Sequence, residues 1–265
     1  MSDKKSVLIT GSSHGIGAAA AIAFAKEGYD VGINYCHSPA DAEDVARQCR
    51  ELGADAQVYR ADVSKREDCE NMLHAFIEHF GKIDVLINNA GGALKMPKGG
   101  FIDMPMDYWD SQIALNLSSA AYCAHVAAKD MVEKGVHGAI INVSSVHSLV
   151  TWVRRKALPY SAGKAGLNMF TKSIGVELIK YGINVNCIAP GLVYTKIMSR
   201  YSDKDITGFN RKIPIGHGGK PEDIVPMMLF LADKEKSGFI VGQTIFIDGG
   251  QTIDGAIDNM LEDEF

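Results

Sequence analysis

The 265-residue sequence predicts an α/β fold, a doubly wound Rossmann-type parallel sheet of about seven strands with helices on both faces. Three observations indicate this fold. Short runs rich in Val and Ile alternate with longer amphipathic stretches. Several of the runs are apolar almost throughout, which is typical of parallel strands buried on both faces. A glycine-rich turn directly follows the first run, where folds of this class bind nucleotides.

The order of the elements supports the same fold. The predicted strands are residues 6–10, 30–35, 56–61, 84–88, 139–144, 183–188 and 244–248, and the predicted helices are 15–28, 38–52, 65–80, 107–134, 160–181 and 221–233. Strand–helix alternation implies a doubly wound α/β sheet with right-handed crossovers. We expect a single domain over residues 1–265, with irregular segments 92–106, 146–159 and 190–220 as substrate loops.

Composition and charge argue against several classes of function. A net charge of −5 and a pI of about 5.9 give no electrostatic reason to expect nucleic acid or an anionic membrane as a partner. The N-terminal stretch is too polar for a signal peptide, and no apolar run is long enough to span a bilayer. The five cysteines are scattered and form no C-x-x-C pair, which disfavours disulfides and metal sites. We therefore expect a cytoplasmic protein that binds no metal.

The stretch TGSSHGIG at residues 10–17 follows the first predicted strand. Gly11, Gly15 and Gly17 remove side chains where the backbone must turn tightly and approach a ligand. The next helix then directs its N-terminal amides at a pyrophosphate. The spacing G-x-x-x-G-x-G differs from G-x-G-x-x-G, and a glycine-rich turn alone is also explained as a simple strand–helix connection. Its position before an alanine-rich helix favours dinucleotide binding.

The end of the second predicted strand bears on the choice of dinucleotide. Folds that prefer NAD place a carboxylate there, against the ribose hydroxyls. Here the sequence reads NYCHS, with Tyr35 about where the acid would stand. A 2′-phosphate would meet no repulsion, and His14 and His37 could add positive charge, although both are equally explained as solvated surface imidazoles. The sequence therefore predicts NADP, with NAD as the alternative.

The stretch YSAGKAG at 160–166 pairs a phenol with an ammonium. Tyr160 and Lys164 are four residues apart, so on a helix they share one face. A nearby cation favours the tyrosinate and lowers the pKa of the phenol from near 10, which suits a general acid/base. Taken alone, Y-x-x-x-K is common on solvated helices, so this interpretation depends on the other motifs.

Seven segments, in the right order, resemble the short-chain dehydrogenase/reductase family over nearly the whole chain. They are TGSSHGIG (10–17), ADV (61–63), NNAG (88–91), Asn116 in ALNLSS, INVSS (141–145) followed by Tyr160 and Lys164, PG (190–191) followed by Thr195, and FIDGG (246–250). Each segment falls at the expected strand end or helix. Locally the chain is most similar to bacterial glucose and sugar-alcohol dehydrogenases.

The resemblance implies a proton-transfer set. Tyr160 would exchange the proton of the reacting oxygen, Lys164 would lower the pKa of Tyr160 and bond the nicotinamide ribose, and Ser145 would bond the carbonyl or alkoxide oxygen. Asn116 would hold a water that relays protons through Lys164. Ser144 stays an alternative to Ser145. The separation of fifteen residues from Ser145 to Tyr160 looks about two residues longer than is usual in the family.

The resemblance also implies the residues that contact the cofactor. They are Gly11, Ser13, His14, Gly15, Ile16 and Gly17, then Tyr35, His37, Asp62 and Val63, then Asn89, Ala90 and Gly91, then Tyr160 and Lys164, and finally Pro190, Gly191, Val193 and Thr195. The first groups would hold the pyrophosphate and the adenosine end. The last group would line the nicotinamide, which exchanges hydride with the substrate carbon.

The three irregular segments should frame the substrate pocket. Candidate contacts besides Ser145 are His147, Trp152, Tyr194 and Met198; His147 could instead bond the loop backbone. The cations Arg154, Arg155 and Lys156 lie in the segment that looks lengthened. They could attract an anionic substrate, lie on the pocket rim, or pair with acidic residues of a neighbouring subunit.

The predicted function is NAD(P)-dependent hydride transfer between nicotinamide and a secondary alcohol or ketone, such as a sugar, a polyol or a steroid. Family members are usually homotetramers or homodimers, which implies a homo-oligomer built on helices 107–134 and 160–181 and the last strand. One alternative is a 3-ketoacyl-carrier-protein reductase, which needs a basic docking surface. A second is a non-catalytic dinucleotide-binding regulator, which the retained proton-transfer set disfavours. No nucleic-acid or membrane partner is expected.

Overall fold

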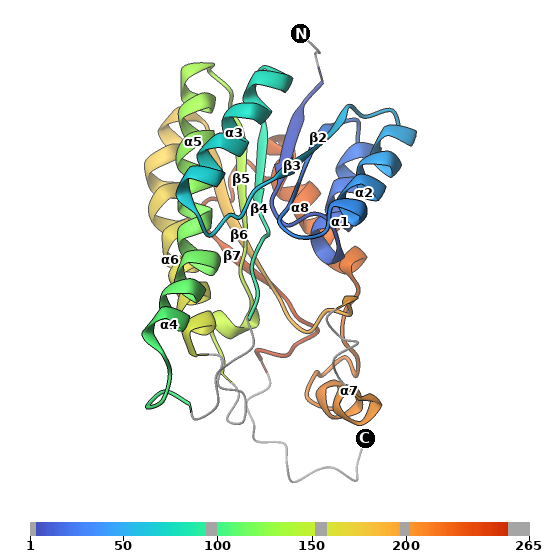
Figure 1. Ribbon diagram of the computed structural model, residues 1–265, viewed down its shortest axis with the longest axis vertical. Helices are drawn as coiled ribbons and strands as arrows, with labels where there is room; N and C mark the ends of the chain where they lie inside the picture. Colours follow the sequence, from blue (N-terminus) through green and yellow to red (C-terminus); the bar gives the residue numbers. More distant parts are fainter. Residues whose placement is uncertain (1–3, 94–99, 152–157, 197–201, 254–265) are drawn as a thin grey trace.

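The computed structural model describes residues 4–93, 100–151, 158–196 and 202–253. Within those ranges the strands form one seven-stranded parallel sheet, with the order β3-β2-β1-β4-β5-β6-β7 (Figure 1). The predicted fold class is therefore confirmed. The substrate-loop candidates Trp152, Arg154, Arg155, Lys156 and Met198 lie outside the described residues.

The strands match the apolar runs of the sequence, with ends that differ by at most two residues. They are β1 (Ser6–Ile9), β2 (Asp30–Tyr35), β3 (Ala56–Arg60), β4 (Val85–Asn88), β5 (Ala139–Val143), β6 (Asn184–Pro190) and β7 (Thr244–Ile247). The chain builds outward from β1 to β3, then returns to β4 and builds outward on the other side. The strand order thus reverses between β1 and β4, where open α/β sheets bind ligands at their carboxyl ends.

Two layers of helices cover the sheet (Figure 1). One layer contains α1 (Gly15–Lys26), α2 (Pro39–Glu51) and α8 (Pro221–Ala232), and the other contains α3 (Arg66–Phe80), α5 (Ser119–Glu133) and α6 (Leu158–Leu178). Short elements complete the described chain: α4 (Met106–Ile113), a π turn (Ala114–Ser118), 3₁₀ turns (Val146–Ser148 and Ile179–Tyr181), α7 (Asp203–Asn210) and α9 (Lys234–Ser237).

Each face of the sheet has its own apolar core. Val7 and Ile9 of β1 pack toward α1, α2 and α8, whereas Leu8 packs toward α3 and α5. Successive side chains of a strand point to opposite faces. Because both faces are buried, both sets of positions must be apolar, which explains the nearly uninterrupted apolar runs.

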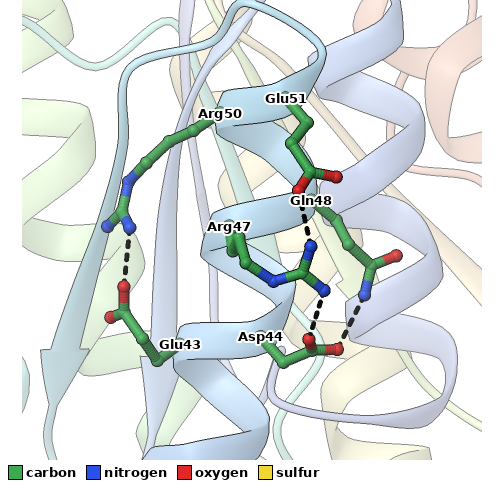
Figure 2. A network of polar contacts seen from close by, with 6 residues as sticks. All are labelled: Glu43, Asp44, Arg47, Gln48, Arg50 and Glu51. Carbon is green, nitrogen blue, oxygen red and sulfur yellow. Dashed lines mark hydrogen bonds and ion pairs between the residues drawn. The ribbon is translucent and has the colours of Figure 1, made fainter.

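Charged side chains cover the solvent face of α2. The network comprises Glu43, Asp44, Arg47, Gln48, Arg50 and Glu51 (Figure 2). Arg47 bonds Asp44 at 2.6 Å and Glu51 at 2.5 Å, and the first of these hydrogen bonds lowers the pKa of Asp44. Arg50 also donates from Nε to the carbonyl of Ala56 at 2.9 Å, which joins α2 to β3. Both arginines are therefore committed to local partners.

The structure corrects the prediction that segments 146–159 and 190–220 are irregular. The first contains a 3₁₀ turn at Val146–Ser148 and, from Leu158, the start of α6; the second contains α7. A capping box begins α7, because Ser202 Oγ accepts from the amide of Asp205 and Asp205 Oδ2 accepts from the amide of Ser202. The stretch SDKD at 202–205 was the missed signal for this helix start.

Gly32, in the middle of β2, lies against the core on the α3 face. A Cβ atom at this position would come within 2.6 Å of the ring of Phe76 and 2.8 Å of a methyl group of Leu8. Both neighbours are fully buried. We expect Gly32→Ala to lower the free energy of unfolding by about 1–3 kcal/mol through overpacking, as measured by urea denaturation.

Gly208 in α7 provides the matched control. A Cβ atom there would meet nothing within 4 Å, and alanine favours helix more than glycine does. Gly208→Ala should keep or slightly raise the stability. Equal stability of the two variants would contradict tight packing at Gly32.

Candidate active site

The glycine loop between β1 and α1 lies at the strand-order reversal. Gly11 and Gly15 have φ angles of 61° and 59°, in the left-handed region that favours glycine. A Cβ on Gly11 would come 2.9 Å from the Cα of Ala90, and one on Gly17 would come 2.6 Å from the carbonyl oxygen of Gly11. Backbone conformation and close approach both require glycine in this loop.

The start of α1 is suited to an anion. Its N-cap residue, His14, is exposed and makes no side-chain capping bond, and the first turn carries no acidic residue. The first amides of a helix lack intrahelical partners and lie at the positive end of its dipole. With the glycine cradle beside them, these residues fit the pyrophosphate of a dinucleotide.

Side chains at the ends of neighbouring strands hold the glycine loop in place. Thr10 Oγ1 accepts from the amides of Asn89 at 3.0 Å and Ala90 at 2.9 Å, and Asn89 Nδ2 donates to the carbonyl of Gly11 at 3.0 Å. On the other side, Asn34 Oδ1 accepts from the amide of Gly11 at 2.9 Å. Thr10 and Asn34 were not predicted from the sequence; their position at strand ends was the available signal.

The predicted adenosine end lies along β2 and the segment after β3. Tyr35 is half-buried, and the exposed His37 places Nε2 3.3 Å from Cys36 Sγ. Asp62 Oδ1 accepts from the hydroxyl of Ser64 at 2.7 Å, and Val63 is buried in the core. The carboxylate of Asp62 is thus held by its own turn.

Lys164, Asn116 and Gly91 meet at one point. Lys164 is buried, and its Nζ donates to the carbonyl of Val143 at 2.7 Å. A Cβ atom on Gly91 would come 2.9 Å from both Lys164 Nζ and Asn116 Oδ1. Lys164 Nζ also lies 5.9 Å from the centroid of the Tyr160 ring. The structure therefore brings together three of the four predicted catalytic residues.

A π turn at Ala114–Ser118 interrupts the helix predicted over 107–134, and Asn116 lies in this turn. Its Nδ2 donates to the carbonyls of Gln112 at 3.0 Å and Gly92 at 3.2 Å, while its Oδ1 accepts from the amide of Gly92 at 2.9 Å. Single π turns inside helices are frequent at functional sites. Local periodicity did not predict the interruption.

The adjacent serines have different partners. Ser144 Oγ donates to the backbone carbonyl of Lys164 at 3.1 Å. Ser145 begins the 3₁₀ turn, and its Oγ accepts from the amide of His147 at 3.2 Å. The His147 ring meets the Tyr160 ring edge-on, with centroids 5.8 Å apart. Ser145 and His147 thus lie on the Tyr160 side of the site, and their substrate roles stay predictions.

Asn168 and Ser148 link the two catalytic segments and were missed. Asn168 Nδ2 donates to Ser148 Oγ at 2.8 Å, and Ser148 Oγ donates to the carbonyl of Ser145 at 2.6 Å. Asn168 follows Lys164 by four residues and Tyr160 by eight, so all three share one face of α6. That spacing was the signal for Asn168. The link fixes the serine segment to the helix that carries Tyr160.

Burial shifts the ionisation of Lys164. Desolvation lowers its pKa from 10.5 to about 8, and the smaller electrostatic effect of Cys187 acts in the opposite direction. Desolvation also raises the pKa of the Cys187 thiol to about 11. An ammonium with a pKa near 8 can release and recover a proton close to neutral pH.

The end of β6 reaches toward the glycine loop. Pro190 is the last strand residue, and a Cβ atom on Gly191 would come 2.8 Å from the Cα of Asp248. Val193 is buried, and Thr195 Cγ2 lies 3.2 Å from the position of a Cβ on Gly15. Residues predicted to contact nicotinamide and pyrophosphate are thus neighbours.

Tyr194 holds α7 in place. Its hydroxyl donates to Asn210 Oδ1 at 2.7 Å and accepts from the amide of Gly218 at 3.0 Å. These bonds tie the end of α7 to the segment before α8. Contact between Tyr194 and substrate stays a prediction.

Two further features concern metals and membranes. Over the described ranges, no group of three or more His, Cys, Asp or Glu side chains is placed to hold a metal ion. None of the helices that the structure describes combines the length and the apolar character needed to cross a bilayer.

The chain is similar to known dehydrogenases and reductases over nearly its whole length. Residues 11–252 match the family model described as enoyl-(acyl carrier protein) reductase. The chain is 36% identical to 3β-hydroxysteroid dehydrogenase 1 of Eggerthella lenta, over 94% of each protein. It is 34% identical to glucose 1-dehydrogenase 2 of Bacillus subtilis, over 94% of this chain and 95% of that protein. A short-chain type dehydrogenase/reductase from Mycobacterium marinum superposes with a TM-score of 0.86 and 31% identity, covering 94% and 95% of the two chains.

The depressed pKa of Lys164 makes stability depend on pH. Between pH 10.5 and about 8 the unfolded chain holds a proton that the folded chain does not. The cost of burying Lys164 is therefore full below about pH 8 and absent above pH 10.5. Relative to Lys164→Met, the wild type should gain roughly 3 kcal/mol of unfolding free energy as the pH rises through this window.

Urea denaturation of both proteins across that pH range measures the effect. Because Cys187 and Lys164 influence each other's pKa, both proteins also carry Cys187→Ala, which removes the titration of the thiol from the comparison. A stability difference that stays constant with pH would contradict the buried, depressed ammonium.

Proposed function

The chain belongs to the short-chain dehydrogenase/reductase family, and we propose that it is an NADP(H)-preferring enzyme that transfers hydride between nicotinamide and a secondary alcohol or ketone. The observation that carries the proposal is the meeting of Lys164, Asn116 and Gly91 beside Tyr160. This cluster adjoins the glycine cradle at the carboxyl ends of the strands. Cofactor and proton donor would therefore serve one pocket.

The glycine loop and its neighbours would hold the cofactor. Gly11 and Gly15, with the first amides of α1, would bind the pyrophosphate, and Asp62 and Val63 would lie at the adenine. Thr195, beside Gly15, would lie near the nicotinamide end. When bound, the nicotinamide supplies or accepts the hydride.

Tyr160 would supply the proton in reduction and remove it in oxidation. Ser145 would bond the same substrate oxygen, where negative charge develops. Lys164 Nζ lies 5.9 Å from the centroid of the Tyr160 ring, and its pKa near 8 would let it restore the proton of Tyr160 through a bridging group. Asn116 would hold a water that connects Lys164 to solvent.

A cyclic secondary alcohol is the substrate class that we favour. The two curated relatives described above are named for a hydroxysteroid and for glucose, and in both the oxidised hydroxyl is borne by a saturated ring. A sugar in its ring form, a cyclic polyol or a steroid would present such a ring hydroxyl to Tyr160. His147, whose ring meets that of Tyr160, would be a further polar contact.

An acyl-carrier-protein reductase is the second candidate, because the matching family model carries the description of an enoyl reductase of that kind. Our specific alternative is a 3-ketoacyl-carrier-protein reductase. It would dock an acidic carrier protein, which a chain of net charge −5 does not favour. A regulator that binds dinucleotide without catalysis is the third, and the clustered catalytic side chains disfavour it.

We also propose a cytoplasmic location, a single domain and a homotetramer or homodimer. All five cysteines are free, which suits a reducing compartment. An apolar stripe on α6, formed by Ala162, Ala165, Met169 and Val176, faces outward; Met169 and Val176 are 61% and 76% exposed. Small and flexible residues at this spacing permit a second helix to pack closely.

Replacing Tyr160 by Phe should abolish turnover while leaving cofactor binding intact, because only the proton donor is lost. We expect the rate to fall by at least 10²-fold. NADPH consumption would be followed with sugars, polyols, hydroxysteroids and ketoacyl thioesters, and NADPH affinity by nicotinamide fluorescence. Tyr181→Phe, on the surface after α6, is the control and should keep full activity.

Each outcome distinguishes the candidates. Turnover of a ring alcohol but not of a thioester supports the main proposal, and the reverse supports the carrier-protein reductase. Tight cofactor binding with wild-type turnover that survives in Tyr160→Phe would overturn the role of Tyr160.

Charges placed in the α6 stripe should disrupt the assembly. Light scattering of the wild type should give two or four times the chain mass of 28.6 kDa. Met169→Glu with Val176→Glu should give a smaller species, because the apolar stripe could no longer be buried. Leu52→Glu, an exposed position after α2, is the control and should leave the mass unchanged. A monomeric wild type would contradict the proposed assembly.

A further inference from the structure

We propose that Arg60, the last residue of β3, binds the 2′-phosphate of NADP and sets the cofactor preference. The proposal rests on the proposed function and assigns one residue to its cofactor selectivity. Arg60 is not part of the catalytic cluster, and the described contacts that hold the fold together do not involve its guanidinium. Arg60 is exposed at the carboxyl end of the edge strand of the sheet.

The register of the sheet places Arg60 beside the expected ribose position. Arg60 is the Cα partner of Tyr35, the last residue of β2. Tyr35 packs on the core beneath α1 and α2, as does Val58, two residues before Arg60. Side chains two apart in a strand share a face, so Arg60 projects beside Tyr35 on the α1 and α2 side. This is the strand end where a carboxylate would otherwise select NAD.

The charge of Arg60 acts on Cys36, the residue that follows Tyr35. Burial and the Asp62 carboxylate raise the pKa of Cys36, and Arg60 opposes them. The guanidinium therefore lies close enough to residue 36 to act on it electrostatically. His37 follows directly and is exposed, so a phosphate bound here would have a second side chain with a hydrogen-bonding group beside it.

Arg60 is available for a ligand, whereas two arginines of α2 are not. Arg47 and Arg50 on α2 are bonded to carboxylates (Figure 2). Within the described parts of the chain, the Arg60 side chain makes no hydrogen bond or ion pair. The nearby Asp62 bonds Ser64 and lies 4.0 Å from Lys65. A guanidinium at a sheet edge without a protein partner can offer its planar donors to an incoming phosphate.

The chemistry of the two groups matches. Arginine presents parallel N–H donors that bind phosphate oxygens in a bidentate manner, and the pair is stronger than one between neutral groups. NAD carries a hydroxyl where NADP carries the phosphate dianion. Arg60 would thus stabilise bound NADP and contribute little to bound NAD, and the absence of a carboxylate at Tyr35 would remove the opposing preference.

Dissociation constants of the full chain test the proposal without reference to turnover. We would measure NADPH and NADH by fluorescence, and 2′,5′-ADP and 5′-AMP by calorimetry, for wild type, Arg60→Gln and Arg60→Lys. Arg60→Gln should weaken NADPH and 2′,5′-ADP about tenfold or more and leave NADH and 5′-AMP unchanged. Arg60→Lys keeps a positive charge but lacks the paired N–H donors of the guanidinium. It should recover part of the affinity for NADPH and 2′,5′-ADP that Arg60→Gln loses.

Arg47→Gln is the matched control, because it removes an exposed arginine of α2 that already has carboxylate partners. It should leave all four constants unchanged. A wild type that prefers NADPH, with the preference intact in Arg60→Gln, would overturn the role of Arg60 and leave the proposed function standing. If Arg60→Gln weakened the binding of NADPH and NADH equally, Arg60 would support the fold and would not recognise the 2′-phosphate. That result would overturn the proposal. A wild type with no preference for NADPH would overturn both this role and the cofactor preference.

Discussion

The buried ammonium of Lys164 and its 2.7 Å hydrogen bond to the carbonyl of Val143 constrain the whole site. A charge removed from water is costly unless it is hydrogen-bonded, so the end of β5 and the start of α6 must stay in register with each other. The same burial brings the pKa of Lys164 to about 8. Placement of the group and its capacity to exchange protons therefore have one physical cause.

The buried position of Lys164 also limits the size of the side chains that can surround it. Residue 91 must lack a side chain, because a Cβ atom would contact both Lys164 Nζ and Asn116 Oδ1 at 2.9 Å. Asn116 reaches this point from a π turn, and its amide bonds the carbonyl of Gln112. Glycine at position 91 and a widened helical turn at 114–118 are thus parts of one arrangement.

The sheet connects this centre to the cofactor cradle. Thr10 at the end of β1 binds the amides of Asn89 and Ala90, so the glycine loop is fixed to the segment that leads to Gly91. Asn34 fixes the same loop from β2, next to Tyr35 and, through the register, next to Arg60. The strand-order reversal between β1 and β4 lets groups far apart in sequence line one edge.

Sequence patterns predict the fold class, all seven strands of the described sheet, the six main helix positions and the pairing of Tyr160 with Lys164. These follow from periodicity, glycine positions and i,i+4 spacing, which are local properties. The roles of Thr10 and Asn34 are visible only in the folded chain, as are the link from Asn168 through Ser148 to Ser145 and the availability of Arg60. Such contacts join residues from about 20 to 80 positions apart, as the bonds of Asn168 and Thr10 do, and no short-range pattern records which side chains meet when strands align.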